Sequence, residues 1–386
     1  MRTYEVTVKV LSPLHVGNSE GQLSALSYFQ SDQMVFLSDE KKWARILAEG
    51  QSVDLFVSQV EGGIQSLDRI LSNLSRFKPH VAAKLQKKGI LRAIPKKPVG
   101  MNLSGPLHVF VTDPLTNNVY LPGSSLKGAI RTNIIYSLIH FHPESFAKVK
   151  HAALSSKNKD AKTVGVELDD LLRSKLTGKN VPPRSQRGPG TDWLSAFRLS
   201  DLHPSKNNVT EVREVRVISI IDGKGYRWGA RGLRMYVETI RPGTTLHGRL
   251  IIDETALRLL KLHTDEYPSF DLQDWVRVIE EKSKTLISEE KELLSRAGLG
   301  SLVDALERIE REGANLRLGW GATLLGTTPA VLHFTKEERL RLRQHYFPKR
   351  SNPLFPYSRK VIVEGNLPID TFGWVKITVE KRGGKD

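Results

Sequence analysis

Residues 121–131 read Leu121-Pro-Gly-Ser-Ser-Leu-Lys-Gly-Ala-Ile-Arg131, a turn that leads into a helix. Pro122 and Gly123 mark the turn, and Ser124 and Ser125 are of the type that caps helix N-termini. Apolar residues then recur at every fourth position, which predicts an amphipathic helix that ends before Pro143. These apolar residues are Leu126, Ile130, Ile134 and Leu138.

The start of this predicted helix has the features of an anion site. Unpaired backbone N–H groups, two hydroxyls and the cations Lys127 and Arg131, one turn apart, would suit a phosphate. The pattern fits a capped core helix with solvated charges equally well. Nucleotide hydrolysis is a poor fit, because a Walker A loop needs lysine and a hydroxyl where Ala129 and Ile130 follow Gly128.

Other cofactor and metal motifs are also missing from the sequence. The glycines of residues 223–229 miss the dinucleotide spacing by one residue, and they precede strand-like sequence. The chain has no cysteine, which excludes disulfides, thiolate metal sites and cysteine nucleophiles. No compact cluster of carboxylates and histidines is present, so we expect neither a metal nor a cofactor.

The overall charge points to a polyanionic partner. Lys and Arg number 58 against 42 Asp and Glu, a net charge of +16 over 386 residues. A hydrophobic content of 39% fits a soluble globular protein of two or three structural units. We expect a cytoplasmic protein without membrane association, since there is neither a signal peptide nor an apolar run of spanning length. Nucleic acid is therefore favoured over lipid.

Part of this charge is concentrated in a segment with helical periodicity, residues 41–98, which we interpret as an insertion. It ends in a run of cations that contains no acidic residue. Such a run is usually a solvated face, but this imbalance favours a polyanion. The cations are Arg76, Lys78, Lys84, Lys87, Lys88, Arg92, Lys96 and Lys97.

A second basic segment lies between two predicted strands, residues 212–221 and 233–240. The glycine-rich connection mixes cations with aromatic residues, as proteins that bind single-stranded RNA do. An ordinary basic hairpin is the alternative. The residues concerned are Lys224, Tyr226, Arg227, Trp228 and Arg231.

Two shorter segments carry candidate residues. His15, in Ser12-Pro-Leu-His15-Val-Gly17, follows a predicted strand and is a candidate general base or RNA contact, or a structural histidine. In the segment that begins at Arg317, Gly319 and Gly321 flank Trp320 and allow close approach of an anion or of neighbouring protein. Residues 141–191 are polar and predict an irregular loop.

Taken together, these segments resemble the RAMP superfamily of CRISPR proteins. Within it, their order and spacing are most similar to the family of the fifth subunit of the type III-A (Csm) effector complex. The segments are Leu14-His-Val-Gly17, residues 121–131, Glu238-x-x-Arg-Pro-Gly243, Arg317-Leu-Gly-Trp-Gly321, Arg359-Lys360 and Phe372-Gly-Trp-Val375.

The resemblance implies an α+β fold with a ferredoxin-like, RRM-related RAMP core. Residues 1–40 and 99–254 would form that core, interrupted by the basic helical insertion 41–98 and carrying a β-hairpin thumb near 205–240. Residues 255–386 would add a helical segment, the glycine-rich loop and the final strands.

The resemblance also implies a function, that of a non-catalytic subunit that binds CRISPR RNA, caps the 3′ end of the guide and supports guide maturation and antiviral defence. Its partners would be guide RNA, single-stranded target RNA, other Csm subunits (especially the repeated backbone subunit) and host nucleases. The expected RNA-binding residues are His15, Gly123, Ser124, Ser125, Lys127, Arg131, Lys224, Tyr226, Arg227, Trp228, Arg231, Arg317, Gly319, Trp320 and Gly321.

One departure from the superfamily bears on catalysis. The backbone subunit that cleaves target RNA has an aspartate soon after its His-x-Gly segment, whereas this chain has none before Asp32. We therefore expect no cleavage of target RNA. The alternative is a metal-independent endoribonuclease that processes CRISPR RNA, with His15 as general base and Lys127 stabilising charge on the phosphate.

Overall fold

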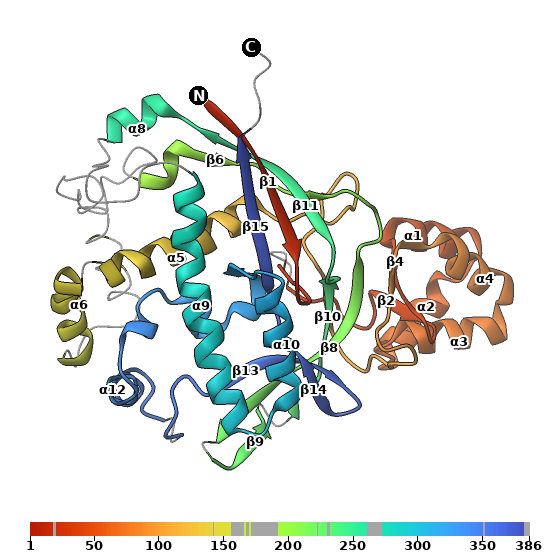
Figure 1. Ribbon diagram of the computed structural model, residues 1–386. Coiled ribbons are helices and arrows are strands. Elements are labelled where there is room, and N and C mark those ends of the chain that lie inside the picture. The colour runs from red at the N-terminus through yellow and green to blue at the C-terminus, as the bar shows by residue number, and fades with distance from the viewer. Residues whose placement is uncertain are drawn as a thin grey trace.

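The computed structural model describes residues 1–17, 21–141, 143–155, 166, 170, 192–221, 223–229, 232–260, 272–349 and 352–381. Two large β-sheets and the helices packed on them form the main body, and a small sheet with four helices projects from one side (Figure 1). In the described residues, no helix is long and apolar enough to cross a membrane.

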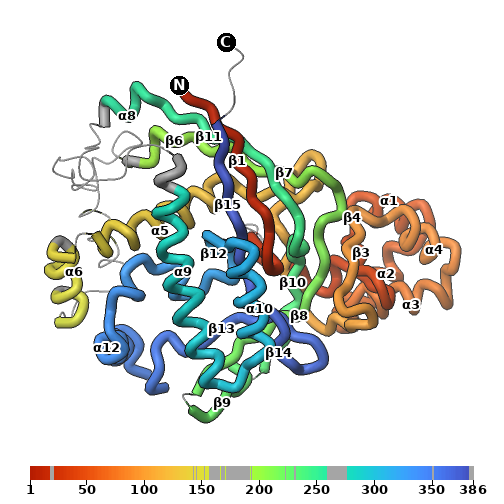
Figure 2. Tube along the Cα trace, in the orientation of Figure 1, coloured from red at the N-terminus to blue at the C-terminus, as the bar shows by residue number. Residues whose placement is uncertain are grey.

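The first sheet is built around β1 (Arg2–Val10), which lies between β11 (Thr245–Ile252) and β15 (Trp374–Lys381) and is antiparallel to both. This pairing places the first and last strands of the chain side by side (Figure 2). The strand order is β12-β15-β1-β11-β6, and β7 also pairs with β11. The shorter strands are β12 (Leu316–Arg317), β6 (Phe197–Leu199) and β7 (His203–Pro204).

The predicted helix after residue 121 is α5 (Gly123–Phe141), and it packs against the first sheet in the largest core cluster. Its second half is not amphipathic, because every residue from Asn133 to Ile139 is buried. The long helix α9 (Leu272–Arg296) crosses it (Figure 1). Asn133 and Ser137 donate to backbone carbonyls of α9, which satisfies these polar groups inside the core.

The second sheet has β8 (Thr210–Ile221) as an inner strand. β13 pairs along one side of β8, and both β9 and β10 pair along its other side. The strand order is β14-β13-β8-β10-β5. The remaining strands are β5 (Leu107–His108), β9 (Gly225–Trp228), β10 (Met235–Ile240), β13 (Ser358–Glu364) and β14 (Leu367–Asp370).

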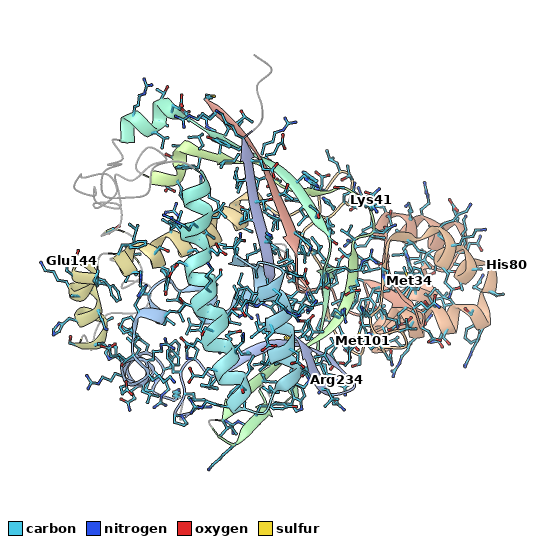
Figure 3. The ribbon with its side chains drawn as sticks, viewed as in Figure 1. Met34, Lys41, His80, Met101, Glu144 and Arg234 are labelled. Carbon is cyan, nitrogen blue, oxygen red and sulfur yellow. The ribbon has the colours of Figure 1, made fainter. Side chains whose placement is uncertain are left out.

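The insertion contains helices, as predicted, and also a strand that was not predicted, β4 (Ile90–Pro95). β4 pairs with β3 (Met34–Ser38), which pairs with β2 (Tyr28–Gln30). In Figure 3, Lys41 and His80 lie on this insertion, and Met101 lies where the chain returns toward the large sheets. The helices are α1 (Glu40–Glu49), α2 (Val53–Glu61), α3 (Leu67–Phe77) and α4 (Pro79–Lys88).

The loop predicted for residues 141–191 is helical in its first part, and residues 156–165, 167–169 and 171–191 lie outside the described residues. Residues 143–155 form α6 (Pro143–Ser155) rather than an irregular loop, because Phe146 and Ala153 pack into the main core. The final strands of residues 255–386 belong to the two large sheets, β15 to the first and β13 to the second. The remaining helical elements are α8 (Glu254–Leu260), α10 (Gly300–Arg311), α11 (Thr323–Thr327), α12 (Lys336–Tyr346), η3 (Trp193–Ala196), η5 (Gly319–Ala322) and η6 (Val331–His333).

Candidate nucleic-acid interface

The predicted RNA-binding residues fall into three places in the fold: the start of α5, the junction between His15 and η5, and the β8–β9 hairpin. In each place, residues of a predicted segment contact residues from a distant part of the chain.

At the start of α5, the polar groups are largely paired within the protein. The helix begins at Gly123, so Ser124 and Ser125 lie in its first turn and are not N-caps, which corrects the prediction. The Gly123 N–H donates to Asp201 Oδ1 at 2.8 Å, and Arg131 Nη2 donates to both carboxylate oxygens of Asp192, at 2.6 and 2.5 Å. A carboxylate therefore already occupies one end of the predicted phosphate site.

The other groups at this helix start remain partly accessible. Ser124 is exposed, and Lys127 and Ser125 are half-buried. Burial lowers the pKa of Lys127, and Asp192 partly opposes this. A Cβ at position 123 would overlap backbone of residues 199 and 200, so glycine is required there by neighbouring protein.

His15 is a core residue whose ring is fixed by the protein. Only 3% of the residue is exposed, and its Nδ1 donates to the carbonyl oxygen of Glu238 at 2.8 Å. Phe110 and Trp320 both contact the imidazole edge-to-face. Burial lowers the pKa of His15 to about 4, so the ring is neutral at neutral pH.

Glu238 joins this histidine to the insertion. Its side chain is fully buried and accepts two hydrogen bonds from Arg92, at 2.5 and 2.8 Å, and one from the Phe110 N–H at 2.9 Å. Arg92 was predicted to belong to a polyanion-binding run, but its charge is neutralised inside the protein.

The glycine-rich turn η5 is folded directly onto the His15 segment. The Trp320 N–H donates to the His15 carbonyl at 2.9 Å, and a Cβ on Gly319, whose φ is +71°, would overlap that carbonyl. A Cβ on Gly321 would overlap the backbone of Phe372. Both glycines therefore allow close approach of protein backbone, which was one of the two interpretations left open by the sequence.

Trp320 itself is half-exposed beside two basic side chains, and we call Trp320, Lys360 and His108 the tryptophan cluster. Lys360 Nζ lies 3.7 Å from the Trp320 ring centroid, and the His108 ring centroid lies 4.9 Å from that of Trp320. Burial lowers the pKa of Lys360 to about 8, and burial together with Lys360 lowers that of His108. The cluster combines a half-buried indole with a cation that lies over its ring, on the second sheet.

Arg317 does not reach that surface. It is 4% exposed, and its guanidinium pairs with Glu290 at 2.9 Å and lies over the Trp374 ring. Glu290 also accepts from Arg359 at 2.8 Å. The expectation that Arg317 contacts RNA is therefore corrected: it belongs to a buried ion network between α9, β12 and β13.

The hairpin divides the predicted basic and aromatic residues between two faces. Tyr226 and Trp228 pack on the second core cluster, and Arg216 lies 4.9 Å from the Trp228 ring centroid. Lys224 and Arg227 are exposed. Arg231 lies outside the described residues.

The tryptophan cluster includes residues to which sequence reasoning assigned no role. His108 comes from β5 and has no local motif. Lys360 comes from β13 and belongs to the segment Arg359-Lys360, which contributed to the family resemblance without an assigned role. In the described part of the chain, no group of three or more histidine or carboxylate side chains is placed to hold a metal ion.

Comparison with known proteins identifies relatives along most of the chain. A family model described as the RAMP superfamily matches residues 7–323. A protein from Methanocaldococcus jannaschii described as "CRISPR system Cms protein Csm5" is 25% identical over 413 residues, covering 98% of this chain and 89% of that protein. One of the same description from Mycobacterium tuberculosis is 21% identical over 271 residues, covering 66% and 67%.

Solved structures share the fold. A chain in the cryo-EM structure of a Csm–crRNA–target RNA ternary complex of a type III-A CRISPR-Cas system superimposes with a TM-score of 0.65. It is 21% identical, and the match covers 97% of this chain and 100% of that one. The crystal structure of T. onnurineus Csm5 gives a TM-score of 0.54 at 18% identity, covering 96% and 99%.

Proposed function

The chain belongs to the RAMP superfamily, and from this premise we propose that it is a non-catalytic, RNA-binding subunit of a type III-A (Csm) effector complex. In this proposal it caps the 3′ end of the CRISPR guide RNA and supports guide maturation. Its partners are guide and target RNA, the other Csm subunits, especially the repeated backbone subunit, and nucleases that it recruits. The relatives described as Csm5 and the fold shared with a chain of a Csm–crRNA–target RNA complex support this assignment.

The observation that carries the RNA-binding role is the tryptophan cluster. A half-exposed indole with a lysine ammonium 3.7 Å from its ring centroid combines a stacking surface with a cation. Single-stranded nucleic acid is bound by this combination, since every base has a π-face and every linkage a negative charge. The exposed cations Lys224 and Arg227 of the hairpin extend the proposed RNA site.

We propose that the protein is not catalytic because His15, the candidate general base, is buried and hydrogen-bonded inside the protein. A general base must come within hydrogen-bonding reach of the 2′-hydroxyl that it deprotonates. His15 is 3% exposed, Phe110 and Trp320 pack against its ring, and its Nδ1 is bound to the Glu238 carbonyl. These contacts favour a structural histidine over the endoribonuclease alternative.

We also propose that the first sheet with α5 is the ferredoxin-like core and that the β8–β9 hairpin is the thumb. The hairpin's β8 is hydrogen-bonded to β13 as well as to β9, so its root is held within the second sheet. Of the predicted residues at the start of α5, Ser124, Ser125 and Lys127 remain proposed guide contacts, because they are at least partly exposed.

Capping can be tested with reconstituted complexes whose guide RNA carries a 5′ label. A 3′→5′ exoribonuclease should shorten the guide when this subunit is omitted and leave it protected when the subunit is present. A Trp320→Ala/Lys360→Ala variant should give partial protection, and Phe347→Ala, which changes another exposed aromatic residue, should protect fully. Equal digestion with and without the wild-type subunit would contradict capping.

A further inference from the structure

The helical insertion carries half of the net charge of the protein. Residues 41–98 contain twelve Lys and Arg against four Asp and Glu, a net +8 out of +16 for the chain. The segment that carries this charge has 58 of the 386 residues. Part of it is internal: Arg92 pairs with Glu238, and Lys96 is buried and donates to the Met101 carbonyl at 2.6 Å. The remaining cations are concentrated on the outside of the insertion.

Two rows of these cations lie side by side on α1 and α4. Lys41 and Arg45 are one turn apart on α1, as are Lys84 and Lys88 on α4, so each row has a spacing of about 6 Å. All of them are exposed, as is Lys87. The rows belong to one face, because Lys84 Nζ lies 2.5 Å from Glu49 Oε2, and Arg45 and Lys88 also lower the pKa of Glu49.

The two helices hold this face rigidly. α4 ends where α1 begins, since the Asp39 N–H and the Trp43 Nε1 both donate to the Gly89 carbonyl, at 2.8 and 3.0 Å. Beneath them, Trp43, Ile46, Leu47 and Leu85 are buried in one core cluster. The face therefore presents its cations at fixed spacing, and Figure 3 labels one of them, Lys41, on the insertion.

Glu49 is the only acidic residue in these rows, and Lys84 neutralises it. Within the described residues, Lys41, Arg45, Lys87 and Lys88 form no ion pair. The two helices expose no large apolar side chain. Their other exposed residues are Glu40, Ala44, Ala48, Pro79, His80, Ala83 and Gln86. The face lacks the aromatic or aliphatic anchor that protein interfaces and membrane surfaces use.

We propose that this α1–α4 face is a second nucleic-acid site, which binds the phosphate backbone without reading sequence. Its cations neutralise phosphates, and its exposed residues include no Phe, Tyr or Trp; His80, one turn before Lys84 on α4, is its one aromatic ring. The site rests on the insertion alone and is separate from the tryptophan cluster. Either a single strand or a duplex offers the phosphate spacing and charge that it recognises.

The test is a salt titration of the full-length protein with labelled RNA, single-stranded and duplex, of guide length. The variant is Arg45→Gln/Lys84→Gln/Lys88→Gln, and the control removes three exposed cations elsewhere, Lys206→Gln/Lys284→Gln/Lys336→Gln. The variant should bind at least about tenfold more weakly at low salt. The slope of log K against log salt should become less steep for the form of RNA that the face binds. The change should be about 2 if that form is single-stranded and nearly 3 if it is duplex. The loss should be equal for oligo(U) and oligo(A).

A second variant tests the site by gain of affinity. Glu49→Lys removes the one acidic residue and adds a cation, so it should tighten binding and steepen the salt slope. The inference is wrong if the triple variant behaves as its control does and Glu49→Lys has no effect. It is also wrong if the triple variant binds RNA normally but fails to join the reconstituted complex, because the face would then bind protein.

These outcomes separate this inference from the proposed function. Trp320→Ala should weaken RNA binding with little change in the salt slope, because it removes stacking rather than a charge. If Trp320→Ala weakens binding and the triple variant matches its control, only the second site is rejected. If the wild-type protein binds no RNA in either form, both proposals fail.

Discussion

Lys360 and Trp320 contact each other twice, although they come from β13 and from the turn after β12. The Lys360 ammonium lies 3.7 Å from the indole centroid and donates to the Trp320 carbonyl at 3.3 Å. Trp320 in turn rests on the ring of buried His15. The half-buried indole of the proposed RNA site is thus supported by a buried polar residue.

Replacing the indole should weaken RNA binding without unfolding the protein. Stacking of a base on an aromatic side chain contributes about 1–3 kcal/mol, so Trp320→Ala should reduce affinity for single-stranded RNA about 5- to 150-fold. Fluorescence anisotropy at fixed salt measures this. Phe347→Ala, a change at an exposed aromatic residue outside the tryptophan cluster, should leave affinity within about twofold. Equal losses of affinity in the two variants would show that Trp320 is not a specific stacking residue.

RNA binding should weaken as the pH rises past 8. Burial lowers the pKa of Lys360 to about 8, so the free protein loses this charge above that pH, whereas a bound phosphate favours the protonated form. Affinity should fall by up to about tenfold per pH unit between pH 8 and 9. Lys360→Arg keeps its charge there and should flatten the profile. An identical profile in this variant would exclude Lys360 as the titrating group.

His15 should make the fold sensitive to mild acid. Its pKa is about 4 in the folded protein, lowered mainly by burial, against about 6.5 when unfolded. Because the unfolded chain binds the proton first, stability should decline as the pH falls from about 6.5 to 4, by on the order of 3 kcal/mol.

Urea unfolding at several pH values should therefore show a shallower decline for His15→Asn than for the wild type, whatever its absolute stability. His80 is exposed at the far end of the insertion, and His80→Asn should keep the wild-type slope. A parallel decline for His15→Asn and wild type would show that other groups carry this pH dependence, such as His333, whose pKa burial also lowers to about 4.

The buried ion network should depend on Glu290. Burial alone would raise the pKa of this carboxylate, but Arg317 and Arg359 together lower it. Its contribution to stability is thus present above its unfolded pKa of about 4.3 and is lost as the pH falls through the lower folded value. Glu290→Gln leaves two buried guanidinium groups unpaired and should destabilise the protein by about 3–5 kcal/mol at pH 7.

The matched control is Glu292→Gln on the same helix. Glu292 is 56% exposed and pairs with Lys336 at the surface, so its loss should change stability by less than about 1 kcal/mol. Thermal unfolding at pH 7 compares the two. Similar small changes would mean that the three buried charges contribute little net stability.

The sequence was sufficient where structure follows from local pattern. The turn at Pro122 and the apolar spacing after it predict α5, and the helical periodicity of residues 41–98 predicts helices where α1 to α4 are found. It failed at β4, because that short strand acquires its conformation by pairing with β3. It also could not reveal that β15 lies against β1, since Tyr4 and Lys381 meet only in the tertiary fold.

The same limit applies to the candidate site. Arg317 and Lys360 are both cations near apolar strands, and nothing in their immediate sequence distinguishes them. The fold places Arg317 against Glu290 in the interior and leaves Lys360 half-exposed over an indole. Cations such as Arg131 and Arg92 were predicted to face RNA or another polyanion, but Asp192 and Glu238 pair with them. Burial and pairing of charges depend on contacts between distant segments.

The measurement that tests the central claim most directly is a titration of the purified protein against labelled single-stranded RNA of guide length. The same samples, with EDTA or with magnesium, would be run on native and denaturing gels. We predict a shifted, intact RNA whose affinity falls steeply with salt and falls further in Trp320→Ala. RNA that is shortened by repurified protein, and left whole by His15→Ala, would contradict the non-catalytic assignment and make this protein an endoribonuclease.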